Sequence, residues 1–219
     1  MAEEPVGEDA LWATDLEEET QAYEDLLAPP AFLAGEKKAT AAEAGTATHV
    51  FMQFCDFEHL KQNGPRAELD RLVKEKFLPE DMASLVKLSH VERFLRSPLF
   101  AEMESASLKR EFRFNLLLPA DHFTAEPVRK KHLAGEQILV QGVIDCLLFY
   151  PDGRYVLIDY KTDYLTQEER ENSDLAAAKL RARHGHQLAY YGLACEKMLG
   201  RKPEKILIYS LPLGDSVAL

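Results

Sequence analysis

Two aspartates interrupt the two most apolar segments of this chain, and they constrain its fold more than any other feature. Asp145 lies within VQGVIDCLLFY, and Asp159 lies within YVLIDYK. Both segments are apolar on both faces, which is typical of strands near the middle of a sheet. The Pro151-Asp152-Gly153 sequence between them is typical of a tight turn. The sequence therefore predicts a central β-hairpin, with strands over 138–150 and 154–161, that buries two carboxylates.

The register of this hairpin decides how the carboxylates lie. If the turn is a three-residue loop, Tyr150 pairs with Arg154, and counting back along both strands places Asp145 directly opposite Asp159. Their Cβ atoms would then lie about 5 Å apart on one face of the sheet. Two like charges this close repel unless a cation lies between them, and a divalent ion with oxygen ligands meets that need. A loop one residue shorter would make the carboxylates offset neighbours, which weakens the argument without removing it.

Lys161 follows Asp159 by two residues, so strand alternation puts both side chains on the same face. A lysine there can reach a metal-bound water or a scissile phosphate and neutralise charge that develops during a reaction. The alternative is a purely structural hairpin in which Lys161 forms a salt bridge with one aspartate. The second aspartate, in register, favours the metal site. Thr162 and Asp163 end the strand, and we assign no chemistry to them.

Periodicity elsewhere predicts an α/β protein. Gly64-Pro65 separates two helical patterns, Ser89 is a candidate N-cap, Pro98 is expected to end the helical stretch, and Gly200 is expected to end the last helix. We expect helices at about 40–60, 66–77, 80–87, 89–96 and 186–199, further strands at 108–118 and 205–211, and polar or charged segments at 119–136 and 164–183. This order predicts a mixed central sheet flanked by helices, with extra helices on the N-terminal side.

The net charge of −11 is concentrated in the first 36 residues, which contain eleven Asp and Glu and no Lys or Arg. The rest of the chain carries all 26 Lys and Arg and as many acidic residues, so the charge does not exclude a nucleic-acid partner. We expect an acidic linker or arm over 1–36, ending near Pro29-Pro30, ahead of one domain over 37–219. Basic clusters at 128–132 and 179–186 are candidate DNA contacts or simply solvated surface.

The three cysteines are Cys55, Cys146 and Cys195, which lie far apart in the chain. Their spacing matches no zinc or iron–sulfur site, so we expect reduced core thiols in a cytoplasmic protein and no iron–sulfur cluster. No apolar run approaches the roughly 20 residues that a membrane span needs, and the acidic N-terminus lacks the layout of a signal peptide. We therefore expect no membrane association.

Several motifs resemble those of the RecB-type nucleases of the PD-(D/E)XK superfamily, above all the nuclease domain of the AddA-type helicase–nucleases. The strongest are QGVID at 141–145 and LIDYKTD at 157–163. Four more stretches fit in the same order, namely AGTATH at 44–49, REFRF at 110–114, QLAYY at 187–191 and ILIYS at 206–210. The resemblance covers roughly residues 29–219 and implies a restriction-endonuclease-like PD-(D/E)XK core.

The resemblance also implies which residues form the site. The metal ligands would be His49, Asp145, Asp159 and the backbone carbonyl of Tyr160, and Lys161 would be the catalytic lysine. A helical histidine beside apolar residues is more often a core residue, so the assignment of His49 depends on the resemblance. The implied cofactor is Mg²⁺, for which Mn²⁺ is expected to substitute.

Three further residues are candidates for substrate contact or for support of the ligands. Gln187 and Tyr191 lie four residues apart, so they share a helix face and could point into the site. The alternative for both is ordinary helix packing and polar surface. Glu111 alternates with Phe112 and Phe114 and is expected to face away from them, as an outer ligand or as a strand-surface acid.

The implied activity is that of a DNA exonuclease that hydrolyses phosphodiester bonds during double-strand-break repair and recombination, together with an AddB-like subunit. One departure matters, because the chain has no G-x-x-x-x-G-K-[ST] loop to cradle nucleotide phosphates. We therefore expect no ATP site in this chain and a helicase motor in the same parent chain or in a separate subunit. The acidic, proline-containing start favours a domain taken from a longer protein.

Two alternatives to this interpretation have their own sequence signatures. A catalytically silent DNA- or protein-binding module on the same fold would not need the carboxylates and the lysine. A free-standing nuclease of the Cas4 kind normally carries four cysteines for an iron–sulfur cluster, whereas this chain has three, none suitably spaced.

Overall fold

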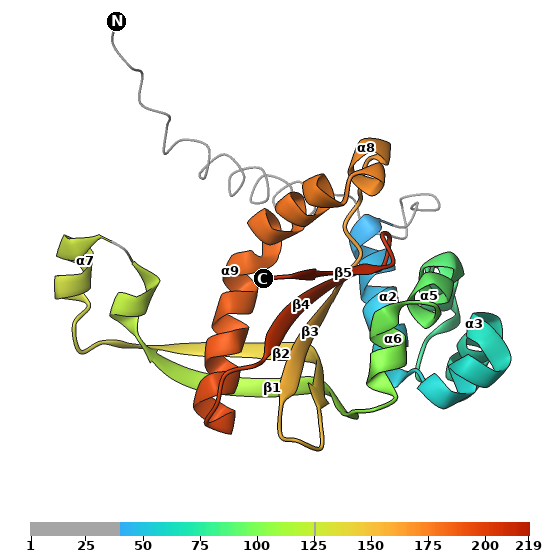
Figure 1. The fold of residues 1–219 in the computed structure, drawn as a ribbon, viewed down its shortest axis with the longest axis horizontal. Coiled ribbons are helices and arrows are strands. Elements are labelled where there is room, and N and C mark those ends of the chain that lie inside the picture. Colours follow the sequence, from blue (N-terminus) through green and yellow to red (C-terminus); the bar gives the residue numbers. More distant parts are fainter. Residues whose placement is uncertain (1–39, 125) are drawn as a thin grey trace, which may run out of the picture. The chain divides into compact units, whose positions relative to one another are not determined.

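The computed structural model describes residues 40–124 and 126–219, so the expected acidic arm over 1–36 lies outside the described residues and stays a prediction. A five-stranded sheet with the order β1-β2-β3-β4-β5 forms the centre of the domain (Figure 1). The β3–β4 pair is parallel and the other pairs are antiparallel. The strands are β1 (Ser107–Pro119), β2 (Gln137–Phe149), β3 (Tyr155–Lys161), β4 (Lys205–Ser210) and β5 (Asp215–Ala218). The predicted α/β class with a mixed sheet is confirmed, and β5 is an addition to it.

Within the part of the chain that the structure describes, five helices precede the sheet and pack against one of its faces. They are α2 (Ala41–Phe54), α3 (Phe57–Lys74), α4 (Glu80–Ala83), α5 (Leu88–Leu95) and α6 (Pro98–Met103). Thr40 and Glu43 form a reciprocal capping box that starts α2, which satisfies backbone N–H groups that a helix start leaves free. The predicted helix over 40–60 is divided in the structure, because Asp56 caps a new helix by accepting from the backbone N–H groups of Glu58 and His59.

Two helix boundaries differ from the sequence prediction. Helix α5 begins one residue earlier than expected, with Lys87 rather than Ser89 at its N-cap position. Pro98 begins α6 instead of ending the helical stretch, because Ser97 caps the helix and accepts from Phe100 N–H. Proline is well suited to the first helical position, where its missing N–H costs nothing.

The opposite face of the sheet is covered by one long helix, α9 (Ser173–Leu199). It is 13 residues longer at its start than the predicted helix over 186–199, because the charged segment before it is also helical. Asn172 caps it by accepting from two backbone N–H groups, and Gly200 ends it with φ of 73°, as predicted. A short helix, α8 (Gln167–Glu171), precedes it. The crossover from β3 through α8 and α9 makes β4 parallel to β3.

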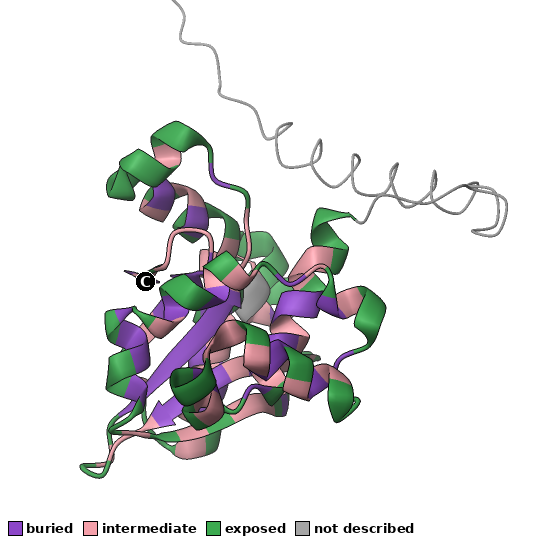
Figure 2. Ribbon diagram, turned by 90° about the vertical axis from the view of Figure 1, so that its right-hand side faces the viewer, coloured by how far each residue is buried: buried purple, intermediate pink, exposed green. Residues whose placement is uncertain are grey.

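Two separate cores lie on the two faces of the sheet, and Figure 2 shows the buried strands between exposed helical surfaces. The N-terminal core lies under α2–α6 and includes Cys146, Leu148 and Ile158. The α9 core includes Leu147 and Leu157. Neighbouring residues of β2 and β3 therefore point to opposite faces, as strand alternation requires. All three cysteines are free and buried.

At one level of the β1–β2 pair, meaning one position on β1 and the position opposite it on β2, the side chains do not alternate between the two faces of the sheet. In β1, Leu108 packs against the N-terminal core, whereas Phe112 packs against the α9 core, although both positions are even-numbered. In β2, Cys146 faces the N-terminal core and Ile144 faces the α9 core. The pairing register remains the same on both sides of this level. Both strands therefore turn over together at this level without slipping.

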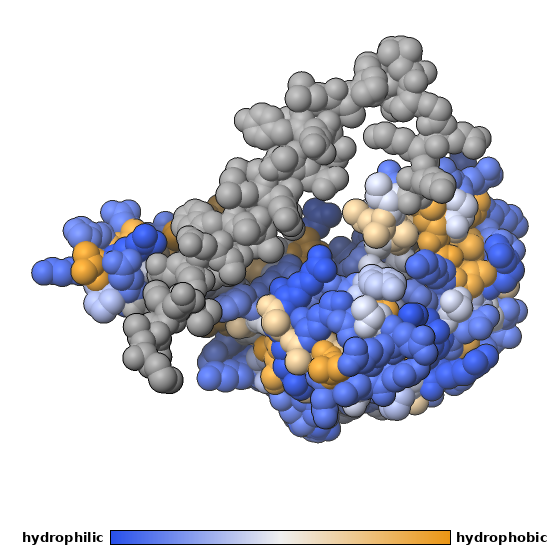
Figure 3. Space-filling view, turned by 90° about the horizontal axis from the view of Figure 1, so that it is seen from above, coloured by the Kyte–Doolittle hydropathy of each residue, from blue (hydrophilic) through white to orange (hydrophobic). Residues whose placement is uncertain are grey.

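Beyond this level β1 and β2 continue as a two-stranded arm past the other strands (Figure 1). The region predicted as irregular, 119–136, caps the arm with a short 3₁₀ helix, η1 (Ala120–Phe123), and with α7 (Pro127–His132). Helix α7 has no buried residue, and the projecting arm carries mostly hydrophilic atoms in Figure 3. Among the described helices, none combines the length and the apolar character that a membrane crossing demands.

Candidate metal centre

The predicted register of the β2–β3 hairpin is confirmed. Tyr150 N–H donates to Arg154 O across the turn at 2.9 Å, and the ladder runs inward as far as the pair Cys146↔Ile158. The next level would place Asp145 opposite Asp159, as the sequence predicts, but the regular ladder ends before it. The two aspartates therefore lie where the strands part.

Asp145 occupies the gap between the parting strands. Its Oδ2 atom accepts a hydrogen bond from Tyr160 N–H at 2.7 Å. In a continued antiparallel ladder that N–H would donate to the backbone of Ile144 instead. Successive backbone carbonyls along a strand point to opposite sides. Lys161 O points to the β4 side, because it accepts a hydrogen bond from Leu211 N–H. The preceding carbonyl, Tyr160 O, therefore points towards β2. The N–H and C=O groups of Tyr160 thus both border the gap. A backbone carbonyl that serves as a metal ligand must lie in this position.

Asp159 and Lys161 point to the α9 face of the sheet. Lys161 Nζ lies 2.7 Å from Asp159 Oδ2, so the salt bridge that we considered as the structural alternative is present. The contact does not have hydrogen-bond geometry, and Asp159 Oδ2 is a buried oxygen without a hydrogen-bond donor. Asp159 is 2% exposed. Burial and the nearby Asp145 charge raise its pKa, although Lys161 and His49 oppose the shift.

His49 approaches Asp145 from α2, as predicted. Its Nδ1 atom lies 3.5 Å from Asp145 Oδ2, and its side chain is 34% exposed. The interaction with Asp145 raises the pKa of His49, while partial burial opposes the shift. His49 is therefore a site residue and not a core histidine, since Phe51 and Met52 on the same helix occupy the core.

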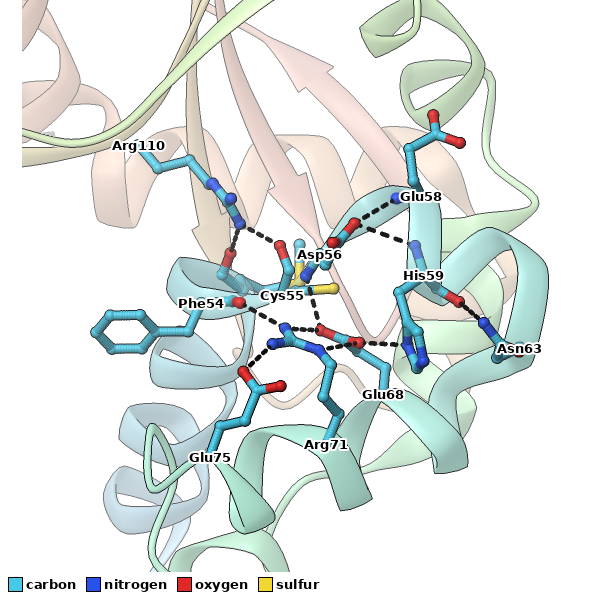
Figure 4. Close-up of polar contacts among 11 residues, drawn as sticks. Phe54, Cys55, Asp56, Glu58, His59, Asn63, Glu68, Arg71, Glu75 and Arg110 are labelled. Carbon is cyan, nitrogen blue, oxygen red and sulfur yellow. Dashed lines mark hydrogen bonds and ion pairs between the residues drawn. The ribbon is translucent and has the colours of Figure 1, made fainter.

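Two arginines fix the end of α2 and hence the position of His49 (Figure 4). Arg110 donates from one nitrogen to Met52 O at 3.1 Å and to Cys55 O at 2.6 Å. Arg71 donates to Phe54 O at 3.1 Å. These bonds satisfy carbonyls that the end of a helix leaves free. Arg110 lies in the REFRF motif, but no role is predicted for it, because a contact between residues 58 positions apart leaves no local signal in the sequence.

A buried carboxylate holds Arg71 in place. Glu68 is fully buried and accepts from Arg71 Nε at 2.9 Å and from Asp56 N–H at 2.7 Å (Figure 4). His59 Nδ1 lies 2.7 Å from Glu68 Oε2, the oxygen that accepts from Arg71 Nε. Burial opposes its ionisation, but these hydrogen bonds outweigh burial and lower the pKa of Glu68. The cluster joins α2 and α3, and it is a support for the site that the sequence prediction missed.

Glu111 is close enough to Asp145 and His49 for their charges to affect its ionisation. It lies opposite Asp145 at the level where β1 and β2 turn over, and its backbone has φ of 52°. Burial and the charge of Asp145 raise its pKa, whereas His49 and Arg113 lower it. Glu111 therefore interacts electrostatically with two of the candidate ligands, Asp145 and His49, so its interpretation as a strand-surface acid alone is insufficient.

Tyr191 and Gln187 share a face of α9, as predicted, and Gln187 Nε2 donates to the Tyr191 hydroxyl at 2.8 Å. Burial raises the pKa of Tyr191, and Asp159 and Asp145 add to the shift, which places Tyr191 within the electrostatic range of the site. The absence of a side chain at Gly142 permits this position. A Cβ atom there would lie 2.6 Å from Phe114 Cζ and 3.0 Å from Tyr191 Cε1.

The candidate ligands do not form a complete metal-binding set in this structure. Across residues 40–124 and 126–219, no three His, Cys, Asp or Glu side chains converge as metal ligands. The reason is local, because Lys161 pairs with Asp159 and the Tyr160 N–H pairs with Asp145. The donors nevertheless fit a divalent cation, which prefers carboxylate and carbonyl oxygens and can accept an imidazole. The buried Asp159 Oδ2 accepts no hydrogen bond, and its ionic partner Lys161 would have to move for a cation to bind there.

The two basic clusters differ in their freedom to bind DNA. All of α7 is exposed, and Arg129 has only an exposed ion pair with Glu126 at 2.9 Å. In contrast, most basic side chains of the cluster over 179–186 already contact other residues of this protein. Lys179 contacts Glu169 at 2.9 Å, and Arg181 donates to Ala218 O at 2.8 Å. The first cluster is therefore the better candidate for DNA contact.

Asp163 has a structural role in this second cluster. Arg183 lies 3.3 Å from it and His184 lies 3.0 Å from it, so Asp163 connects the end of β3 to α9. No chemistry is predicted for Asp163 from the sequence, and its partners lie about twenty residues further along the chain.

Several known proteins are similar to this chain over most of its length. The chain is similar to an AddA-type ATP-dependent helicase/nuclease protein of Acetivibrio thermocellus, with 35% identity over 185 residues, or 84% of this chain and 14% of that protein. The corresponding protein of Heliobacterium modesticaldum is 35% identical over 193 residues, covering 87% of this chain and 13% of the relative. That of Clostridium botulinum strain Alaska E43 is 32% identical over 219 aligned residues, covering 96% and 16%. This chain thus spans only about one seventh of the length of the curated relatives that it matches.

A family model supplies the broader assignment. The model of the PD-(D/E)XK nuclease superfamily matches residues 21–215, which include β1–β4 and every candidate ligand. The protein belongs to the PD-(D/E)XK nuclease superfamily.

Proposed function

We propose that this chain is a metal-dependent deoxyribonuclease domain that hydrolyses phosphodiester bonds as an exonuclease. The observation that carries the proposal is the meeting of His49, Asp145, Asp159 and Lys161 where β2 and β3 part, in a chain of the nuclease superfamily. Three of these side chains are metal-ligand types, and the fourth is a cation able to face a phosphate.

The proposed cofactor is Mg²⁺, with Mn²⁺ as a substitute, held by His49, Asp145, Asp159 and the Tyr160 carbonyl. A bound divalent ion lowers the pKa of a bound water and polarises a phosphate oxygen. Lys161, released from Asp159, neutralises charge that develops on the phosphate.

Two other parts of the site are proposed to contact the substrate or to support the ligands. Tyr191, held by Gln187, offers a hydroxyl close to the same atoms. Glu111 adds a carboxylate opposite Asp145 and is proposed to support the ligands.

The wider context follows from the names of the relatives, which are ATP-dependent helicase/nuclease proteins. We infer that this domain works in double-strand-break repair and recombination with a helicase motor, in the same parent chain or a separate subunit, and with an AddB-like subunit. DNA contact is proposed for the exposed basic residues of α7. A cytoplasmic location accords with three free, buried thiols.

The test is cleavage of end-labelled single- and double-stranded DNA with Mg²⁺ and with EDTA. Wild type should release labelled products only with Mg²⁺, and Asp159→Ala should release none. Asp70→Ala, which removes an exposed acid on α3, is the matched control and should cleave normally. DNA binding without cleavage by wild type would instead support the silent binding module and overturn the nuclease.

A further inference from the structure

A second polar pocket borders the proposed catalytic site. It has a volume of about 240 Å³ and is lined by residues from the start of α2, the start of α5 and the segment from β3 to α8. The polar side chains that line it include Thr48, Lys87, His90, Thr162, Tyr164 and Arg170. The proposed nuclease mechanism uses none of these residues.

The pocket is adjacent to the catalytic residues along both chain segments that supply them. Thr48 directly precedes His49 on α2, and Thr162 directly follows Lys161 at the end of β3. Gly45, which also lines the pocket, lies four residues before His49 on α2, about 6 Å along the axis. A Cβ atom at Gly45 would lie 3.1 Å from Thr162 Oγ1, a tight contact, so glycine favours the close approach of α2 to Thr162.

Lys87 and Arg170 bring positive charge to this pocket. Lys87 is exposed, and no carboxylate within residues 40–124 or 126–219 forms an ion pair with it or with Arg170. Arg170 only donates from Nε to Thr166 O at 3.3 Å. Burial and the neighbouring Arg93 and Lys87 lower the pKa of His90 to about 4, which agrees with an excess of cations at this place.

The one carboxylate among the described lining residues is already matched. Asp163 lies within 3.3 Å of Arg183 and 3.0 Å of His184. The groups left for a ligand are therefore a lysine, an arginine and the Thr162 hydroxyl, because Thr48 Oγ1 already donates to Ala44 O at 2.8 Å. Such a set binds the oxygens of a phosphate group, which accept several hydrogen bonds and carry negative charge.

An exposed aromatic ring stands at the same pocket. Tyr164 is 75% exposed, the highest value among the large hydrophobic side chains of the described residues. Its ring has no partner ring within the described part of the chain, and its backbone O accepts from Lys179 at 3.1 Å. A flat ring beside a phosphate site is a stacking platform for a base of a single strand.

We propose that this pocket holds the DNA phosphate next to the scissile one, through Lys87 and Arg170, while the attached base stacks on Tyr164. The inference rests on the proposed function and deepens it by giving the substrate strand a second contact. It also gives the direction in which that strand leaves the catalytic residues, along the start of α2 towards α5.

The experiment measures binding of a fluorescent oligothymidylate by anisotropy in EDTA over a series of NaCl concentrations. The variants are Lys87→Gln/Arg170→Gln and Tyr164→Ala. The matched control is Lys74→Gln/Lys197→Gln, which removes two exposed charges from other surfaces of the domain. The first variant should raise Kd about tenfold or more at low salt and reduce the salt slope by about 1–2, since each lost phosphate contact lowers it by about one.

The other variants separate stacking from charge. Tyr164→Ala should raise Kd about tenfold without changing the salt slope, because base stacking is not ionic. The control should change Kd less than twofold. In the cleavage assay with Mg²⁺, the pocket variants should raise KM much more than they lower kcat.

A pocket variant that binds DNA like the control would overturn the inference, whether or not wild type cleaves. Wild type that binds DNA through this pocket but does not cleave it would overturn only the proposed nuclease. Inorganic phosphate provides a further test by its effect on Tm. If phosphate stabilises wild type but not the double variant, while DNA affinity is the same in both, the pocket is a free-anion site and the inference fails. Absence of any DNA binding by wild type would overturn both proposals.

Discussion

Glu111 and Asp145 lie opposite each other at the one level where β1 and β2 turn over between the two cores. The turnover places Asp145 at the boundary of the two faces of the sheet. It can therefore meet His49, which comes from α2 on one face, while Asp159 and Lys161 come from the other face. A regular strand would direct Asp145 to one face only. The meeting of these four side chains thus depends on this irregularity.

The backbone of Glu111 should carry a cost that glycine removes. Its φ of 52° lies in the left-handed region, which costs an L-residue about 1–2 kcal/mol. Glu111→Gly and Glu111→Ala both remove the carboxylate, but only glycine relieves the backbone. We expect the glycine variant to be more stable than the alanine variant by about 1 kcal/mol in urea denaturation. Equal stabilities would show that this conformation is not strained.

Asp159→Ala and Lys161→Ala should both abolish cleavage but fail for different reasons. Asp159→Ala removes a ligand, so calorimetry should show weaker Mg²⁺ or Mn²⁺ binding. It also removes a buried carboxylate whose pKa is raised, so Tm without metal should rise by about 2–4 °C, the shift expected per kcal/mol for a chain of this size.

Lys161→Ala is the matched comparison at the same site. It should leave metal affinity undiminished, because lysine is not a ligand and competes for Asp159. Cleavage at saturating metal should fall about 10²–10³-fold, as for the loss of one electrostatic donor. Tm without metal should fall, since Asp159 loses its ionic partner. Normal metal binding and cleavage by Asp159→Ala would show that the active site lies elsewhere.

The sequence predicts this site better than it predicts the surroundings. The turn between β2 and β3 defined the hairpin register, because loop length and strand alternation are local rules. The turnover at Glu111 has no local signal, since nothing in the motif requires a left-handed glutamate. The full length of α9 was missed because its first half is charged and lacks an apolar stripe, although Asn172 caps it well.

Arg110 should be necessary for the position of His49 although it touches no ligand. Arg110→Gln removes two hydrogen bonds to the end of α2, which should cost about 2 kcal/mol of stability. It should also weaken metal binding, because α2 is then less firmly held. Lys109→Gln, an exposed neighbour on the same strand, is the control and should change neither quantity. Unchanged metal affinity in Arg110→Gln would show that the cap does not position His49.

The contact between Asp163 and α9 should give a stability that is lost in acid. Burial opposes ionisation of Asp163, but the hydrogen bond from His184 and the charges of His184 and Arg183 outweigh it and lower the pKa below 3.8. A lowered pKa means that the ionised form stabilises the fold above pH 3.8 and that this contribution disappears as the pH falls through the lowered value. Asp163→Asn should therefore lose about 1–2 kcal/mol at pH 7 in urea denaturation. The difference from wild type should persist at about pH 5 and shrink below about pH 4, and a difference that grows between about pH 4 and about pH 2 would mean that the contact does not favour the ionised carboxylate.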